Sequence, residues 1–458
     1  MIDKGALSRV IFLAMLFSSP TTVSPQESSP GSRWLQDASG CKFLDLEMRY
    51  PAEVITWSGI CVDGFVDGRG EVTLSLRRWT FSGVFRQGQI IEGKNVRTNG
   101  TYEGEFKSNL PDGRGTLALN DGRVISGDFV NGRPGGKVSI RYLTGARYEG
   151  EVVNNLVPSG QGKLFFAGGG VYEGSFVEGK PQGYGKSVSA NGDRYEGEFV
   201  QNFFHGKGAL HYSNGATYEG EFVSGMRHGR GKLRYADGGT YEGSFLQNAR
   251  HGTGRYQRSN GDVLEGEWAH DGLHGKGVER LASGVTYEGD FVAGKRQGRG
   301  KWNDNTRGWT YEGQFLDGLF HGTGKLQSKD GYEYSGEFLS GLAQGQGIER
   351  TRNGEFYEGG FVRGGREGHG VLRGQMRGQD YIFDGTFVSG APKGPGVLKI
   401  AGVIVEGEFG PDGLRKARIT AKDGLQFEID RDAGTAIKIN PDGSRTPVTE
   451  KDLPEGVI

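Results

Sequence analysis

Aromatic and polar residues alternate along short stretches of this chain. In YEGEF, residues 195–199, the two rings and the glycine occupy every second position, with a glutamate on either side of the glycine. Because successive side chains of a strand point to opposite faces, the pattern predicts a strand with one aromatic and one acidic face. A polar turn, VQNFFHG, follows. In the next stretch, residues 206–210, the pattern places both glycines and Leu210 on one face and Lys207 on the other. The two stretches predict a β-hairpin, closed by the turn signal SNG.

The five-residue phrase recurs at steps of 23 or 24 residues. Clear copies begin at Tyr102, Tyr148, Tyr172, Tyr195, Tyr218, Tyr241, Leu264, Tyr287, Tyr311, Tyr334 and Tyr357, and degenerate copies begin at Phe81, Ile125, Phe383 and Val405. About fifteen hairpins are therefore expected over residues 81–414. Helix is a poor alternative, because the apolar period is two and interior glycine costs ~1 kcal/mol per residue in a helix. Collagen and disordered linkers fit poorly, since glycine is not at every third position and the aromatics are regular.

Glycine normally weakens a strand, so its periodic placement predicts a packing role. We expect Tyr and Phe rings to lie flat over columns of glycine. On the opposite face, Glu from the first strand would pair with Lys or Arg from the second, at ~0.2–1 kcal/mol for each pair. The 56 acidic and 55 basic residues nearly cancel, so no field of one sign is left to attract nucleic acid, and no nucleic-acid partner is expected.

Residues 218–239, YEGEFVSGMRHGRGKLRYADGG, resemble the MORN (membrane occupation and recognition nexus) repeat, whose phrase is Y-E-G-x-W/F followed by N-G-x-x-x-G-x-G. The resemblance covers roughly three quarters of the chain. The fifth position departs from the family by being mostly Phe, with Trp only at Trp268. The resemblance implies an all-β fold, an elongated single-layer antiparallel sheet of stacked β-hairpins with terminal caps.

The N-terminal residues 1–25 have the layout of a secretory signal peptide. Lys4 and Arg9 precede the apolar run VIFLAMLF, and a segment rich in Ser, Thr and Pro follows. The run is far shorter than the ~20 residues that span a bilayer, which disfavours a membrane anchor. We therefore expect export from the cytoplasm, to a periplasm, a cell envelope or the medium. Residues 26–40 are expected to form a flexible linker.

The only cysteines, Cys41 and Cys61, lie in a segment before the clear repeats, residues 41–80, which we expect to form an N-terminal cap. Together with a signal peptide, two cysteines predict one disulfide; two unpaired buried thiols are the alternative. The segment also resembles the leader of bacterial secreted MORN proteins. At the other end, residues 415–458 lose the phrase, and the alternating stretches LQFEID and TAIKIN predict a capping hairpin before a loose tail, TPVTEKDLPEGVI.

Five histidines recur at one position of the repeat: His205, His228, His251, His274 and His321. A metal ladder is disfavoured, because equivalent residues of successive hairpins are ~9.5 Å apart and Zn–N bonds are ~2.0–2.1 Å. Gln182, Gln297 and Gln344 occupy the same position, which predicts a hydrogen-bonding residue that stabilises a turn. We expect no metal and no cofactor.

Catalytic residues are not predicted either. The glutamate pairs recur in most repeats, whereas a catalytic pair needs one unique environment. No Gly-x-Gly phrase has the strand-to-helix context of a phosphate loop. The strongest breaks in the period, residues 303–310 and 372–381, are expected to be longer turns. The chain is therefore not expected to be an enzyme.

A long repeated surface without a catalytic break predicts a non-catalytic scaffold that binds a protein partner outside the cytoplasm. The alternatives are a membrane-surface or lipid-binding module, and a binder of an extended glycan or peptide; a homodimer is also open. The central repeats, where the phrase is least altered, are the candidate binding surface, with rings that either bind the partner or only pack the sheet. The candidate residues are Tyr195, Phe199, Tyr218, Phe222, Tyr241, Phe245, Trp268, Tyr287 and Phe291.

Overall fold

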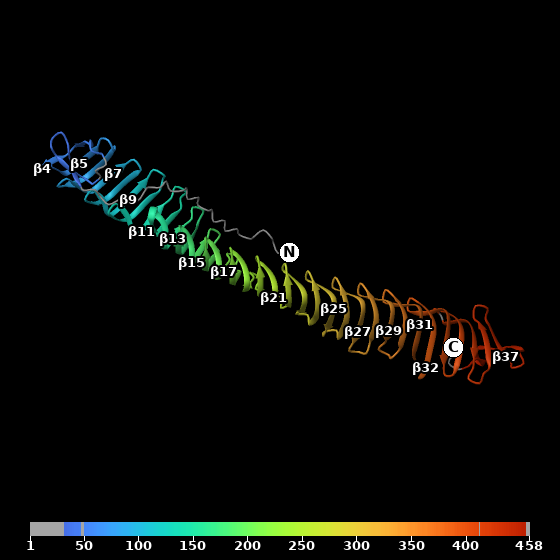
Figure 1. Cartoon of the computed structure of the whole chain (residues 1–458). Coiled ribbons are helices and arrows are strands. Elements are labelled where there is room, and N and C mark those ends of the chain that lie inside the picture. The colour runs from blue at the N-terminus through green and yellow to red at the C-terminus, as the bar shows by residue number, and fades with distance from the viewer. Residues whose placement is uncertain (1–31, 47–49, 412, 455–458) are drawn as a thin grey trace. The chain divides into compact units, whose positions relative to one another are not determined.

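The computed structural model describes residues 32–46, 50–411 and 413–454 (Figure 1). The predicted signal peptide and residues 26–31 of the predicted linker lie outside them. The described chain is nearly all β, as predicted, with two short 3₁₀ turns, Asn154–Leu156 and Glu450–Asp452. It divides into two halves, Met1–Ala236 and Asp237–Ile458, which are treated separately below.

The strands of each half follow one another with only a few residues between them. In the N-terminal half they are β1 (Arg33–Gln36), β2 (Lys42–Asp45), β3 (Ile55–Trp57), β4 (Ile60–Val62), β5 (Phe65–Leu74), β6 (Trp79–Arg86), β7 (Gln89–Arg97), β8 (Gly100–Lys107), β9 (Leu110–Leu119), β10 (Val124–Val130), β11 (Arg133–Arg141), β12 (Arg147–Val153), β13 (Val157–Phe165), β14 (Gly170–Val177), β15 (Lys180–Ser189), β16 (Arg194–Val200), β17 (Phe203–His211), β18 (Thr217–Val223) and β19 (Met226–Arg234).

In the C-terminal half they are β20 (Thr240–Leu246), β21 (Ala249–Gln257), β22 (Val263–Ala269), β23 (Gly272–Arg280), β24 (Val285–Val292), β25 (Lys295–Asp304), β26 (Trp309–Leu316), β27 (Leu319–Ser328), β28 (Glu333–Leu339), β29 (Leu342–Arg350), β30 (Phe356–Val362), β31 (Gly365–Met376), β32 (Gln379–Val388), β33 (Ala391–Ile400), β34 (Val403–Gly410), β35 (Gly413–Thr420), β36 (Gln426–Asp430), β37 (Thr435–Ile439) and β38 (Arg445–Pro447).

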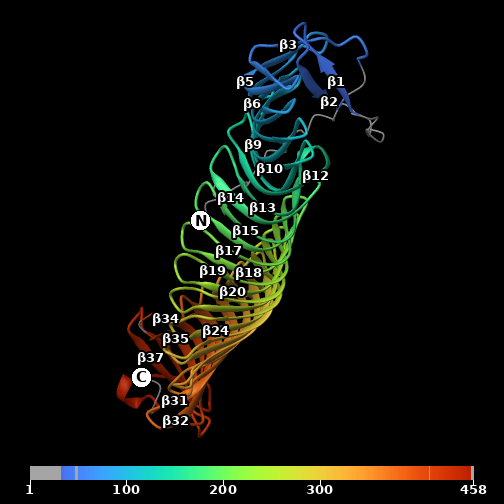
Figure 2. The same ribbon diagram turned by 90° about the vertical axis from the view of Figure 1, so that its left-hand side faces the viewer.

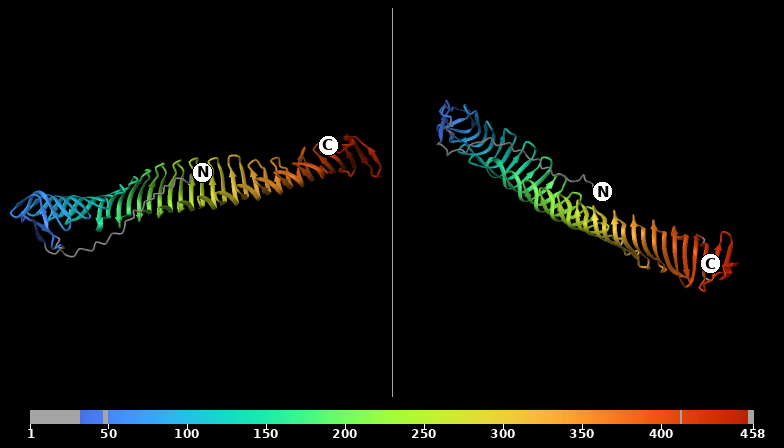
Figure 3. Two further views of the ribbon diagram at one scale, coloured as in Figure 1. Left: turned by 90° about the horizontal axis from the view of Figure 1, so that it is seen from above. Right: turned by 45° about the vertical axis from the view of Figure 1, so that its right-hand side comes forward.

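Strand order in space follows strand order in the sequence. From β5 onward, within each half, every strand pairs antiparallel with the strands before and after it, as in β17–β18 and β23–β24. Figures 2 and 3 show these strands side by side in one open layer within each half. A parallel contact occurs near the N-terminus, where Lys42 of β2 meets Phe65 of β5. Each of the fifteen predicted copies of the phrase lies in the first strand of a hairpin.

The hairpin turns are tighter than the sequence pattern predicted. In the β16–β17 hairpin Val200 pairs with Phe203, so the turn is Gln201–Asn202 alone, and the prediction of a turn over VQNFFHG was wrong. Both turn residues have positive φ, 48° and 76°, as a type I′ turn requires. This turn matches the right-handed twist of the flanking strands, which is why a two-residue connection suffices.

The expected longer turns also differ from the structure in one case. Residues 372–381 do not form a long turn, because β31 and β32 stay paired up to Met376 and Gln379 around another two-residue turn, Arg377–Gly378. Residues 303–310 do contain a four-residue turn, between Asp304 and Trp309. The Asp304 carboxylate stabilises it by accepting hydrogen bonds from the backbone N–H groups of Thr306 and Arg307.

A β-bulge interrupts the register in every complete repeat. In the β18–β19 hairpin Gly220 pairs with Gly231, but the next residue, Glu221, pairs with His228. The extra residues include Gly229, whose φ of 54° lies in the left-handed region that favours glycine. A side chain there would meet the Glu221 carboxylate and not the aromatic ring. The expectation that both second-strand glycines share the aromatic face was therefore wrong for the first of them.

The motif glycine of each first strand and the second glycine of each second strand form the predicted columns. In the N-terminal half they pair across consecutive strands from β12 to β19, as Gly150, Gly162, Gly174, Gly185, Gly197, Gly208, Gly220 and Gly231. In the C-terminal half the same register runs from Gly243 of β20 to Gly407 of β34. Val138 of β11 occupies the column position between Gly127 and Gly150. The prediction that rings cover glycine columns is confirmed.

The repeat register begins earlier than predicted. Trp57 of β3 covers Gly70 of β5, and its indole N–H donates to the carbonyl of Ile60 at 2.8 Å. A two-residue turn, Asp63–Gly64, follows, and both of its residues have positive φ. Across this turn Cys61 pairs with Val66, as Phe222 pairs with Arg227 in the β18–β19 hairpin. Cys61 thus occupies the position of the motif phenylalanine in a first repeat that lies within the segment expected to be a cap.

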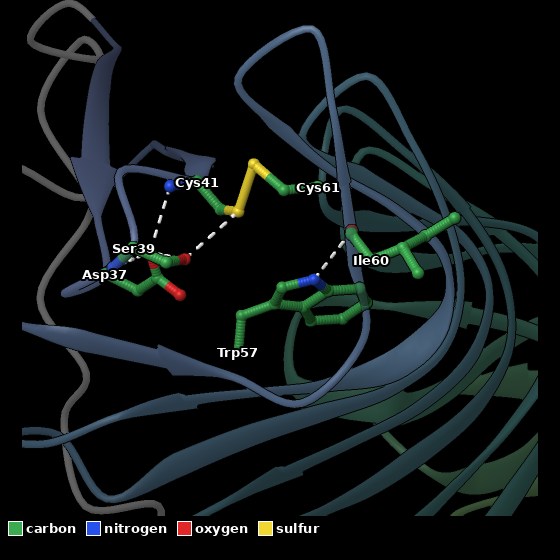
Figure 4. The surroundings of a disulfide bond; sticks show 6 residues. All are labelled: Asp37, Ser39, Cys41, Trp57, Ile60 and Cys61. Carbon is green, nitrogen blue, oxygen red and sulfur yellow. Dashed lines mark hydrogen bonds between the residues drawn. A yellow bond between two sulfur atoms is a disulfide. The ribbon is translucent and has the colours of Figure 1, made fainter.

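The cysteine pair joins this first repeat to the strands that precede it (Figure 4). Cys41 and Cys61 form a disulfide with 5.7 Å between their Cα atoms. Cys41 directly precedes β2, which pairs with β1. Because β1 spans Arg33–Gln36, the expected flexible linker over 26–40 is wrong for these four residues. A buried ion network holds the same region, in which the Arg77 guanidinium contacts Asp45 at 2.7 Å and Glu53 at 2.9 Å.

The C-terminal end is capped by aliphatic residues in place of the ring-on-glycine packing. The predicted hairpin is present as β36 and β37, and its core contains Val403, Val405, Leu414, Ile419, Phe427 and Ile429. The tail is less loose than expected, because Arg445–Pro447 adds β38 to β37. The side of the last repeat that would otherwise contact a further repeat is therefore covered by this mainly aliphatic cluster.

We predict that Gly208→Ala destabilises the protein. The added Cβ would lie 2.4 Å from the Tyr195 hydroxyl and 2.6 Å from its ring carbons, so the ring has to move. Overpacking of this kind costs about 1–3 kcal/mol. The measurement is the denaturant dependence of far-UV circular dichroism. Gly168→Ala is the matched control, because nothing lies within 4 Å of its added Cβ. Equal stability of the two variants would contradict ring-on-glycine packing.

Candidate interaction surface

The motif tyrosine has two roles: its ring covers two glycines, and its hydroxyl bonds to the backbone at the bulge. Tyr218 is completely buried, and its ring lies over Gly220 and Gly231. Its hydroxyl donates to the carbonyl of Glu221, at the bulge, at 3.0 Å. The same bond, from the tyrosine to the residue three positions later, recurs at Tyr102, Tyr148, Tyr172, Tyr195, Tyr241, Tyr287, Tyr311, Tyr334 and Tyr357. The hydroxyl therefore holds the bulge, which a phenylalanine could not do.

The motif phenylalanine links one repeat to the one before it. The Phe222 ring lies edge-on to Tyr218 of its own repeat, with 5.0 Å between ring centroids, and to Tyr195 of the previous repeat, at 5.2 Å. Edge-to-face pairs of this type stabilise by about 0.5–1.5 kcal/mol beyond their area burial. The Tyr–Phe pair therefore supplies both the core of each hairpin and its contact with the next.

All nine predicted binding residues are buried. Tyr195, Phe199, Tyr218, Phe222, Tyr241, Phe245, Trp268, Tyr287 and Phe291 are each between 0 and 4% exposed. Within each half they lie on the aromatic face, as expected, but their surface is used against glycines and each other. Burial favours the alternative in which these rings pack the sheet, and leaves contact with a partner to the residues around them.

In six of the described repeats the second residue after the hairpin turn covers the motif tyrosine, and its type varies. Phe204 stacks on Tyr195 with 3.8 Å between centroids, and Phe320 stacks on Tyr311 at the same distance. In other repeats an arginine lies over the ring, namely Arg227, Arg250, Arg296 and Arg366. The aromatic face thus has a constant interior and an outer layer that differs from repeat to repeat.

Three of these arginines contact carboxylates: Arg250 contacts Asp271 of a hairpin turn at 3.3 Å, and Arg296 and Arg366 contact glutamates on the aromatic face. Arg296 contacts Glu279 at 2.6 Å, and Arg366 contacts Glu349 at 2.8 Å. All four side chains are less than a fifth exposed, so the ion pairs are largely screened from water. At these two positions the outer layer of the aromatic face therefore consists of mostly buried side chains that are held by ion pairs.

The two motif glutamates have different roles, which sequence reasoning had merged into one. The second of them, such as Glu221, lies beside the bulge glycine, and its carboxylate accepts a hydrogen bond from the backbone N–H of Arg230 at 3.0 Å. Glu105, Glu198, Glu267, Asp290, Gln314 and Glu337 make the equivalent bond. The clue in the sequence was that Gln can replace Glu here, which fits an acceptor better than a charge.

The first motif glutamate belongs to a row of alternating charges that crosses the strands on the opposite, charged face. In the N-terminal half Lys163 contacts Glu173 at 3.0 Å, and Lys186 contacts Glu196 at 3.0 Å. These pairs are largely exposed, so each stabilises the fold by at most ~1 kcal/mol. The row keeps the charged face neutral wherever the basic partners are present.

Between the charged rows the glycine column leaves shallow cavities on the charged face. A cavity of about 490 Å³ lies over Gly93, Gly104, Gly115 and Gly127. A larger one, of about 970 Å³, lies over Gly385, Gly396, Gly407 and Ala417 at the end of the array. Charged side chains border both cavities.

An apolar stripe follows the hairpin turns. The residue after the motif phenylalanine is a half-exposed Val or Leu in most repeats, and the residue after the turn is often apolar too. The exposed fraction is 56% at Val130, 52% at Phe203 and 51% at Leu319, Leu339 and Leu342. Single exposed apolar residues need no explanation, but a regular stripe marks a surface that can bind.

The glutamines at the histidine position stabilise turns, as predicted. The side-chain carbonyl of Gln182 accepts from the backbone N–H of Gln201, in the next hairpin turn, at 3.2 Å; Gln297 and Gln344 do the same for Asp317 and Arg363. Within the described ranges no three His, Cys, Asp or Glu residues are arranged to hold a metal ion. No described helix is long and apolar enough to cross a bilayer.

A repeat-family model supplies the assignment. The MORN repeat model matches residues 102–122, 172–194, 195–217, 218–240, 241–263, 265–286, 287–306, 311–331, 334–356, 357–378 and 383–401, which together are more than half of the chain. The chain belongs to the MORN repeat family. The structure places further MORN hairpins in register outside these matches, beginning at Trp57, Phe81, Ile125, Tyr148 and Val405.

Comparisons with whole proteins add little to the MORN assignment. No curated protein matches the chain. Among solved structures, the TCP10 domain of Danio rerio CPAP, in complex with a peptide of STIL, is 13% identical, over 58% of this chain and 98% of that one, with a TM-score of 0.20. The TCP domain of Drosophila melanogaster SAS-4, in complex with a proline-rich motif of Ana2, is 12% identical, over 48% and 90%, with a TM-score of 0.17. Scores this low carry no argument about function.

We predict that alkaline pH unfolds the MORN array through its tyrosines. Burial raises the pKa of Tyr102, Tyr287, Tyr311 and Tyr334 from 10.0 to about 12. The neutral phenol is the form that the fold favours, so this stability is complete below pH 10 and is lost as the pH rises from 10 to 12. Absorbance at 295 nm reports ionisation, and circular dichroism reports unfolding. Reversible ionisation of these tyrosines near pH 10 with unchanged dichroism would contradict the prediction.

Proposed function

We propose that this MORN protein is a non-catalytic scaffold that binds a protein partner outside the cytoplasm. The observation that carries the proposal is that each repeat contains one set of residues that packs the sheet and another set that varies. The motif tyrosine, phenylalanine and glycines are used up in packing, while the residues around them vary and are presented at regular intervals. A repeated frame with a variable outer layer fits recognition of an extended partner better than chemistry at one point.

The central repeats, residues 195–291, stay the proposed binding region on the aromatic face. The motif rings there are buried, and so are Phe204 and Arg250 above them, so contact falls to the partly exposed Arg227 and to exposed residues beside the turns such as Phe203. Phe204, Arg227 and Arg250 differ in shape and charge although they occupy the same position. Aromatic residues and arginine are the types most enriched at interface hot spots, which supports this choice.

Export is supported by the N-terminal sequence and by the cysteine pair. Disulfides persist in oxidising compartments and are rare in the cytosol. The bond between Cys41 and Cys61 ties the strands before the array to its first repeat. A structural bond at the open end of the sheet fits a protein that works in an oxidising compartment.

A membrane-surface role is the second candidate, because the apolar stripe along the hairpin turns could enter a lipid interface. The nearly neutral chain argues against it, since anionic lipid attracts polybasic segments. The two functions separate experimentally. The exported protein should co-purify with a protein from the native envelope at a fixed ratio and should not sediment with liposomes of anionic lipid. Sedimentation with liposomes, without a co-purifying protein, would favour the membrane role.

We predict that the natively exported protein lacks its N-terminal segment and contains the disulfide. Intact-mass measurement should show cleavage between about Ser19 and Gln26, as a signal peptide requires, and two hydrogens fewer than the reduced chain. The reduced and alkylated sample is the control, because it should gain the mass of two modified thiols. Retention of Met1 in the exported fraction, or alkylation without prior reduction, would contradict the prediction.

A further inference from the structure

The charged face changes character near the C-terminal end of the array. From β24 to β27 the row that contains the first motif glutamate alternates in sign, because Glu288, Lys301, Glu312 and Lys325 are register neighbours on consecutive strands. From β29 to β33 the basic positions are apolar in three consecutive repeats, at Ile348, Val371 and Val397, before Arg418 of β35 is basic again. Before β29 in this half, the one such replacement among the described register pairs is Val278. The acidic positions between them are kept.

The acids of this stretch lack basic partners. Glu358 and Asp384 lie in the row between apolar residues. Glu406 and Glu408 of β34 lie opposite Arg418 and Lys416, but these bases pair with Glu428 and Asp430. Within the described part of the chain none of the four forms an ion pair with Lys or Arg; Asp384 contacts His369 at 3.1 Å. All four are exposed. From β29 to β34 this row therefore presents acidic residues without Lys or Arg between them, unlike the row from β24 to β27.

The larger cavity lies over the same residues. Its floor is Gly385, Gly396, Gly407 and Ala417, and apolar side chains on its border include Val397 and Ile437. Asp384, Glu406 and Glu408 border it on one side. On the other side the bases are already paired, Lys416 with Asp430 at 3.0 Å and Arg418 with Glu428 at 3.3 Å. The groove is thus apolar at its base and negative along one edge.

We propose that this groove binds an extended basic segment of a protein partner, a proposal that rests on the scaffold role above. The groove crosses the strands, and acidic positions recur on every second strand, about 9.5 Å apart. A polyproline II segment advances about 9.3 Å in three residues and presents every third residue on one side. A Lys or Arg at every third position therefore meets successive carboxylates, and the intervening apolar residues lie over the glycine floor.

The test uses the full chain and a fluorescent twelve-residue peptide, (Pro-Pro-Lys)₄, with binding followed by anisotropy at low and at physiological salt. Binding should weaken with salt, because it depends on exposed charges. The triple variant Asp384→Asn, Glu406→Gln and Glu408→Gln should bind at least tenfold more weakly. The matched control is Glu219→Gln, an exposed position of the same row in a repeat that keeps its lysine at Lys232; it should bind as the natural chain does.

Several results would overturn the proposal. These are no binding of the peptide, equal binding of (Pro-Pro-Glu)₄, or a loss in the Glu219→Gln control as large as in the triple variant. Circular dichroism of each variant shows whether it is folded, and the neutral substitutions are close in size to the residues they replace. The scaffold role is tested separately by co-purification. If the natural chain co-purifies with a protein partner but does not bind the peptide, the groove proposal is wrong and the scaffold proposal stands.

Discussion

The contact between one tyrosine and two glycines determines most of this structure. The ring can lie on the backbone only because neither glycine has a Cβ, as at Tyr218 over Gly220 and Gly231. The hydroxyl then reaches the bulge carbonyl, and the bulge sets the direction in which the second strand continues. The motif phenylalanine packs against the tyrosine of its own repeat and of the one before. Sheet, bulge and repeat-to-repeat packing therefore depend on the same few atoms.

This dependence explains why the fold could be predicted and the details could not. Period-two alternation at residues 195–199 was enough to predict strands, hairpins and glycine columns, because it is a consequence of strand geometry. The bulge was not visible, since Gly206 and Gly208 look alike in sequence, although one faces Glu198 and the other Tyr195. The earlier start of the array was missed because Trp57 and Cys61 replace the expected Tyr and Phe.

The candidate site was harder to predict for a physical reason. In a single sheet the same aromatic residues can form a core or a binding surface, and the sequence pattern is identical in both cases. Burial separates them, and rings that are 0–4% exposed are already in contact with their own backbone. Position-specific variation is more informative, because residues such as Phe204 and Arg227 are free to differ without disturbing the tyrosine below. The loss of lysine from one row near Val371 and Val397 is the same kind of signal.

The cysteine at the phenylalanine position gives the array a direction. Most motif phenylalanines pack on an aromatic ring of the preceding repeat, as Phe222 does on Tyr195 and Phe85 on Trp57. The first repeat has no repeat before it, and its Cys61 bonds to Cys41 of the preceding strands. Duplication or loss of a whole interior repeat leaves every motif phenylalanine with a preceding repeat to pack on, whereas a repeat added ahead of Trp57 would compete with the disulfide. Relatives of this protein should therefore differ in length by multiples of 23 or 24 residues within the array, while the cysteine-bearing start is inherited as one block.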